Sequence, residues 1–185
     1  DFDLREKVAE DFDDISHNQW QYSKNNDEYT FENFVTKEET LEDYLLLQLT
    51  FSNLKDKDLK LGRYIIESLD ENGYMTISAE QIAKAFKTTE EHVEKVLDVI
   101  HTFEPSGVGA RDLRECLIIQ LAAKGLLEDI VEYIILNHLE DLAENRLNKV
   151  AKQLGITVNQ VQMICDLIRS LEPKPGRSFA GEDSV

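Results

Sequence analysis

The chain is poor in proline, glycine, cysteine and basic residues. Its 185 residues include only 3 Pro and 8 Gly, few for an all-β protein with its many turns. The two cysteines, Cys116 and Cys165, have no C-x-x-C partner, which fits a reducing compartment better than a disulfide framework. Lys and Arg number 20 against 37 Asp and Glu, a formal net charge of −17. This charge argues against a general nucleic-acid coat, because such proteins bind phosphate through Lys and Arg.

Long apolar runs are also missing. No run reaches the roughly 18 residues that a membrane span needs, and no charged-then-apolar leader is present, so we expect no membrane segment and no signal peptide. Apolar residues still make up 42% of the chain, enough to fill a core. Composition therefore predicts a globular, helical, cytoplasmic protein, without indicating its function.

Residues 1–35 differ from the rest of the chain. They carry ten acidic and three basic side chains, and their aromatic residues follow no helical period. This pattern predicts an acidic, loosely ordered arm. An arm that docks its aromatic side chains onto a partner, and becomes ordered on binding, is the alternative.

Helical signals begin at Thr36 and continue to about Leu171. Four sequences have the spacing of a helix-capping pair: Thr36-x-x-Glu39, Ser78-x-x-Gln81, Thr88-x-x-Glu91 and Thr157-x-x-Gln160. The helical period and the breaks at Gly and Pro predict further helices over about 58–69, 110–124, 126–145 and 147–154. No segment alternates for long with period two, so we predict an all-α fold.

An internal repeat is the most informative pattern. Residues 82–105 align without a gap on residues 150–173, at an offset of 68, with eight identities in 24 positions. Two copies of one helix-turn-helix-like unit, each ended by Glu-Pro, explain this more simply than chance does. We therefore predict two packed helical subdomains that each contain one copy. Their ranges are 36–105 and 106–180, with a tail at 181–185 and a boundary near Ser106–Gly109 or, alternatively, near Gly125.

Neither copy has a strong DNA-reading surface. The second helix of the first copy carries Glu90, Glu91 and Glu94, which would repel DNA. The second copy offers polar groups for base edges and cations for phosphate: Asn159, Gln160, Gln162, Arg146, Lys149 and Lys152. A stand-alone helix-turn-helix DNA-binding regulator is therefore the alternative function.

Signs of catalysis are weak. The four histidines, His17, His92, His101 and His138, are scattered, and no Cys lies at ligand spacing from any of them. The sequence contains no nucleophile elbow, phosphate loop or dinucleotide fingerprint. We expect no enzyme activity, no metal, no cofactor and no small-molecule substrate. A hidden pair of buried carboxylates would be the exception, and it would hold acids of raised pKa in a concave site.

The stretch Phe103–Leu121 is dense in unusual residues. Pro105, Gly107 and Gly109 favour a tight loop with a structural role, and the helix that follows would begin near Asp112. A polar cluster flanks this turn, and we predict that it contacts a partner: Arg111, Asp112, Arg114 and Glu115.

The residue order of 103–121 resembles the signature of sigma-54, the nitrogen-type alternative sigma factor of bacterial RNA polymerase, in its core-binding domain. Residues 65–75 resemble a second motif of that family, with Met75 in place of the usual Leu. Residues 168–176, including Pro173 and Gly176, resemble a third motif, and residues 1–35 resemble the acidic second region by position and charge.

The resemblance implies a helical two-part domain that binds core RNA polymerase, chiefly its β and β′ subunits. Family regions that respond to activators or read the promoter have no counterpart in the sequence. We therefore expect a core-binding fragment that reaches promoter DNA only through segments absent from this chain. It would act in the bacterial cytoplasm, at the nucleoid through polymerase.

Overall fold

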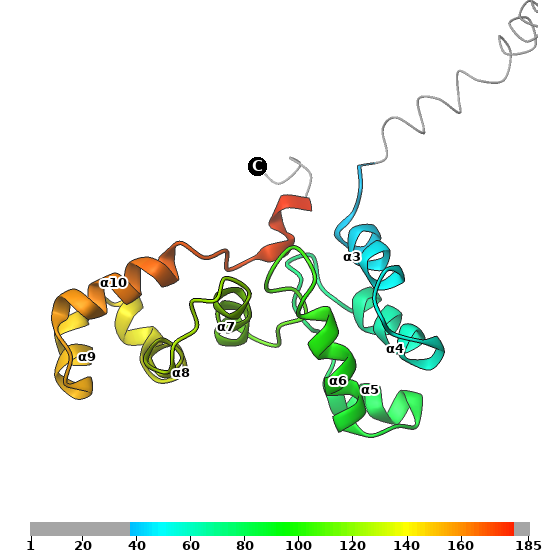
Figure 1. Cartoon of the computed structure of the whole chain (residues 1–185), viewed down its shortest axis with the longest axis horizontal. Helices are drawn as coiled ribbons and strands as arrows, with labels where there is room; N and C mark the ends of the chain where they lie inside the picture. The colour runs from blue at the N-terminus through cyan, green and yellow to red at the C-terminus, as the bar shows by residue number, and fades with distance from the viewer. Residues whose placement is uncertain (1–37, 180–185) are drawn as a thin grey trace, which may run out of the picture. The chain divides into compact units, whose positions relative to one another are not determined.

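The computed structural model describes residues 38–179 of the chain, and residues 40–179 belong to one compact unit. The regular secondary structure of residues 38–179 is helical (Figure 1). This range contains no β-strand, only an isolated β-bridge between Leu69 and Met75. The all-α prediction is confirmed. The predicted acidic arm, residues 1–35, and the predicted tail, residues 181–185, lie outside the described residues.

The first four helices share one apolar core. They are α3 (Leu41–Thr50), α4 (Asp56–Glu67), α5 (Ala79–Phe86) and α6 (Glu90–Ile100). Helix α4 packs against both α3 and α6, and α5 packs against α6 (Figure 1). Leu45, Ile65, Ile82, Leu97 and Ile100 are fully buried in this core. Burial of side chains of this size is the main stabilising contribution, at about 1.5–3 kcal/mol each.

The next four helices share a second core. They are α7 (Leu113–Ala123), α8 (Asp129–Ala143), α9 (Leu147–Leu154) and α10 (Val158–Arg169), followed by the 3-10 helix η1 (Pro175–Phe179). Helix α8 packs against α7 and α9, and α9 packs against α10. The helical backbone of α8 is interrupted at His138, where φ is −131°. Leu121, Ile134, Ile135, Val150 and Val161 are fully buried in this core.

Two of the predicted helix caps lie at other residues. Helix α3 is capped by Thr40, whose hydroxyl accepts from the Asp43 N–H, while the Asp43 carboxylate accepts from the Thr40 N–H. The predicted pair was Thr36-x-x-Glu39; Thr36 lies outside the described residues, and the cap of α3 is Thr40. Helix α6 is capped by Thr89 rather than Thr88, because the Thr88 N–H closes the preceding turn onto Ala83 O over 2.9 Å. The capping boxes at Ser78 and Thr157 are confirmed.

The two copies of the repeat have similar local structure. Lys87 and Gly155, which correspond in the alignment, both adopt the left-handed conformation, with φ of 52° and 67°. Ala83 and Ala151 are both 5% exposed at the corresponding helix contacts. The subdomain ranges that the repeat suggested stay predictions.

Candidate functional site

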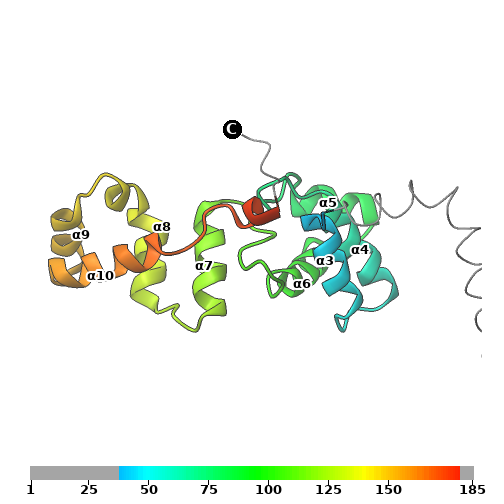
Figure 2. The same cartoon turned by 90° about the horizontal axis from the view of Figure 1, so that it is seen from above.

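Three motifs that are far apart in the sequence meet at one place, which we call the joint: residues 70–75, 105–110 and 173–176. The Gly109 N–H donates to Gly73 O over 2.8 Å, and the Met75 N–H donates to Ala110 O over 2.9 Å. The Gly176 N–H donates to Asn72 O over 3.0 Å. After α10 the chain returns past α7 to reach this place (Figure 2). The joint therefore connects the second core with the first.

The Asp70 side chain holds the turn of the joint. Its Oδ1 accepts from the backbone N–H groups of Asn72 and Tyr74, each over 2.9 Å. The Gly73 N–H also donates to Asp70 O over 3.0 Å. These bonds satisfy backbone N–H groups that would otherwise need water as a partner. The turn can therefore pack against the other two motifs without leaving these groups unsatisfied.

Tyr74 binds the returning chain. Its hydroxyl donates to Pro173 O over 2.5 Å. Burial, together with the neighbouring Cys116, raises the pKa of Tyr74 well above its ordinary value. Burial also raises the pKa of the Cys116 thiol, so this cysteine is neutral at physiological pH and is a poor nucleophile.

Two glutamines hold the Glu-Pro ends of the two repeat copies. Gln120 Nε2 donates to Glu172 O over 2.6 Å, and the Glu172 N–H donates to Gln120 Oε1 over 2.9 Å. Gln48 makes the same pair of bonds with the carbonyl and N–H of Glu104, over 2.5 and 2.8 Å. We call these the amide clamps. They were missed by the sequence analysis, although the similar runs at 46–49 (LLQL) and 118–121 (IIQL) were a visible signal.

At two positions of the joint, a side chain larger than that of glycine would clash with neighbouring atoms. Gly107 has φ of +103°, and a β-carbon there would lie 2.7 Å from Cys116 Sγ. A β-carbon at Gly176 would overlap the Glu71 carbonyl oxygen. Pro105, Gly109 and Pro173 lie in the same joint, and the Glu104–Pro105 peptide bond is cis. A structural role for these five residues stays a prediction.

The four predicted partner-binding residues all have partners within the chain. Arg111 forms two bonds to the Glu94 carboxylate, over 3.0 and 2.7 Å, and an ion pair of 3.2 Å with Glu115. Burial alone would lower the pKa of Arg111, but these two carboxylates more than offset that effect and raise it. Asp112 caps α7 by accepting from the Glu115 N–H over 2.8 Å, and Arg114 pairs with Glu140. Their role in docking stays a prediction.

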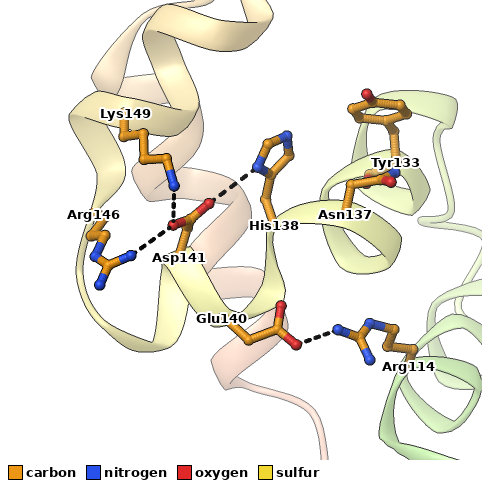
Figure 3. A network of polar contacts seen from close by, with 8 residues as sticks. All are labelled: Arg114, Tyr133, Asn137, His138, Glu140, Asp141, Arg146 and Lys149. Carbon is orange, nitrogen blue, oxygen red and sulfur yellow. Dashed lines mark hydrogen bonds and ion pairs between the residues drawn. The ribbon is translucent and has the colours of Figure 1, made fainter.

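A second polar cluster centres on Asp141, whose side chain is 12% exposed. Lys149 Nζ lies 2.9 Å from its Oδ1, Arg146 lies 3.4 Å from the same atom, and His138 Nδ1 lies 3.4 Å from Oδ2 (Figure 3). The hydrogen bond from Lys149 is the largest cause that lowers the pKa of Asp141. The cluster ties the kinked end of α8 to the start of α9.

Several groups that would be needed to read DNA are engaged inside the protein. Gln160 Oε1 accepts from the Thr157 N–H over 2.9 Å, and Gln162 Nε2 donates to Asp166 over 2.8 Å. The cations Arg146 and Lys149 pair with Asp141. These contacts disfavour a recognition helix at α10. Residues 38–179 also contain no group of three metal-binding side chains and no helix long and apolar enough to cross a membrane.

Comparison with known proteins gives a consistent result. Residues 30–185 match the family described as "Sigma-54 factor, core binding domain". A putative RNA polymerase sigma-54 factor of Clostridium kluyveri is 39% identical over 176 residues, which is 95% of this chain and 38% of the relative. The RNA polymerase sigma-54 factor of Bacillus subtilis is 33% identical over 143 residues, 77% of this chain and 33% of the relative. That of Escherichia coli is 34% identical over 147 residues, 76% of this chain and 31% of the relative. The chain thus spans about a third of the length of these relatives.

Proposed function

Because the chain belongs to the sigma-54 factor, core binding domain family, we propose that it binds core RNA polymerase and carries out no chemistry of its own. The family match over residues 30–185 is the observation that carries this proposal. The proposed partners are the β and β′ subunits, in the bacterial cytoplasm, and the proposal assigns no promoter contact to this chain.

The joint supports this function because its hydrogen bonds connect the two cores. Its backbone hydrogen bonds and the clamp at Gln120 restrain the chain between the two cores. A partner that binds both cores at once then loses less conformational entropy than it would with a flexible linker. The excess of acidic side chains adds to this, since a charged surface speeds association with a partner of opposite charge.

The predicted docking residues fit the same proposal. Arg111, Asp112, Arg114 and Glu115 flank the joint, and the Arg111 side chain keeps 43% of its surface exposed. Their internal ion pairs hold the charged groups in fixed positions. A fixed charged group loses little side-chain entropy when a partner binds it.

A competition experiment tests the proposal. Core polymerase is first saturated with a fluorescently labelled full-length relative, and the unlabelled chain is then added in excess. We expect the chain to displace the relative, because both would occupy the same polymerase surface. A promoter duplex offered to the chain in parallel should show no binding. Full retention of the relative at saturating chain would contradict the proposal, and duplex binding would favour the DNA-binding alternative.

A further inference from the structure

The first core carries an apolar groove that none of the three motifs covers. The groove has a volume of about 530 Å³ and lies between the end of α3, the loop after it and the end of α6. Its walls include Leu47, Phe51, Leu54, Val99 and Phe103, and no residue that lines it is charged. A groove of this size and composition is large enough to take several side chains of a bound segment.

Phe51 is the most exposed large apolar residue of the groove. Phe51 is 81% exposed, and Leu47, one helical turn earlier, is 51% exposed. A phenyl ring in water loses the burial that a core would give it, so such exposure is a cost to the free chain. Aromatic side chains in this situation are frequent anchors of protein interfaces.

The groove is held in shape by the first amide clamp. Gln48 lines the groove, and its two hydrogen bonds to Glu104 fix the chain directly after Phe103. Phe103, which also lines the groove, is 7% exposed and belongs to the first core. The groove is therefore already formed in the free chain and needs little rearrangement on binding.

Charge indicates what binds there. Residues 40–105 carry thirteen acidic and seven basic side chains, whereas residues 106–179 carry ten and nine. Two exposed carboxylates, Asp98 and Glu104, directly adjoin the lining residues Val99 and Phe103 in sequence, and within residues 38–179 neither forms an ion pair. Lys55 and Asp56, which follow Leu54, balance each other in charge. The residues next to the groove lining thus carry unpaired negative charge, which favours a partner with basic side chains.

We propose that this groove binds an apolar segment of core RNA polymerase that is flanked by Lys or Arg, with Phe51 as the anchor. This inference rests on the proposed function and adds to it the surface and the kind of segment bound. Phe51 contacts the apolar side chains of the segment, while Asp98 and Glu104 attract its basic flanks.

The test compares single variants of the chain in binding to core polymerase. Phe51→Ala is the main variant, and Met163→Ala is the matched control, since Met163 is 72% exposed on α10, outside the groove lining. Truncation of such exposed side chains leaves the fold intact, which far-ultraviolet circular dichroism will confirm. We expect Phe51→Ala to raise the dissociation constant by about tenfold or more, and Met163→Ala to leave it unchanged.

A charge variant tests the rim. The double change Asp98→Asn with Glu104→Gln keeps the size and shape of both side chains and removes two negative charges. We expect a slower association rate at low salt, and a rate equal to that of the unchanged chain at high salt. Equal rates at both salt concentrations would overturn the basic-flank part of the proposal.

The outcomes separate this inference from the proposed function. If the unchanged chain binds polymerase and Phe51→Ala binds equally well, the groove proposal is wrong and the proposed function stands. If the unchanged chain does not bind at all, both fail. If the chain self-associates in analytical ultracentrifugation, and Phe51→Ala abolishes only that association, the groove belongs to a second copy and the proposal is overturned.

Discussion

The side-chain amide of Gln120 bonds to both backbone groups of Glu172, over 2.6 Å to its carbonyl and 2.9 Å from its N–H. Gln120 is only 4% exposed and its two bonds to Glu172 are part-buried, so solvent replaces these bonds only in part if the amide is lost. A buried backbone group left without a partner costs about 1–3 kcal/mol. The clamp therefore stabilises the point where the chain leaves the second core for the joint.

Gln120→Leu should lower the free energy of unfolding by about 1–3 kcal/mol, because two part-buried backbone groups lose their partners while the side-chain volume stays similar. Urea denaturation followed by circular dichroism measures this change.

The equivalent clamp provides the control for that variant. The bonds of Gln48 are solvent-exposed, so water can satisfy the Glu104 backbone after Gln48→Leu. We expect a loss of only about 0.5–1.5 kcal/mol there. Equal losses at the two positions would show that burial does not determine the strength of the clamp.

Gly176→Ala should weaken the joint. The added methyl group meets the Glu71 carbonyl oxygen, and backbone cannot move aside as a flexible side chain does. We expect a loss of about 1–3 kcal/mol, with faster hydrogen exchange of the Gly109 amide, which bonds the same turn. Ser178→Ala, an exposed change in the same 3-10 helix, should alter neither quantity.

Tyr74 should make the protein sensitive to alkali. Its folded pKa is raised above the ordinary value of 10.0, chiefly by burial, so its contribution to stability is complete below pH 10 and is lost as pH rises above it. Tyr74→Phe should reduce stability at neutral pH by about 0.5–1.5 kcal/mol. Between neutral and strongly alkaline pH, the free energy of unfolding should fall less for this variant than for the unchanged chain. Urea denaturation at each pH measures the difference. Tyr133→Phe, at a half-exposed position, is the control, and an identical pH profile for Tyr74→Phe would contradict the prediction.

Asp141 should make the protein sensitive to acid. Its pKa is lowered in the folded state, chiefly by Lys149, so its contribution is present above the ordinary carboxyl pKa of about 3.9 and is lost as pH falls below that value. Asp141→Asn should lower the melting temperature at pH 7, and the difference from the unchanged chain should shrink steadily below pH 4. Asp129→Asn, an exposed change at the start of the same helix, should show no such convergence.

Much of the fold was predictable because helix-forming signals are local. The Ser78 and Thr157 caps and the helix Leu147–Leu154 were found from short sequence patterns. The caps at Thr40 and Thr89 were misplaced because neighbouring threonines, Thr36 and Thr88, offer similar spacing. Which threonine caps a helix depends on the turn before it, and that turn is set by contacts that spacing does not encode.

The joint was only partly predictable. The motifs that form it were recognised as unusual, but their meeting depends on contacts between residues about a hundred positions apart, such as Tyr74 and Pro173. The amide clamps were missed because a single glutamine within a helix is ordinary in sequence. Their importance comes from the partner backbone and, for Gln120, from burial of the side chain, which only the folded chain reveals.

A direct titration of core RNA polymerase with this chain tests the central claim most directly. It should be carried out at two salt concentrations, with a promoter duplex as the parallel ligand. The account predicts a submicromolar dissociation constant for polymerase, weakened by salt, and no binding to the duplex. Binding to the duplex with a steep salt dependence, and none to polymerase, would contradict it.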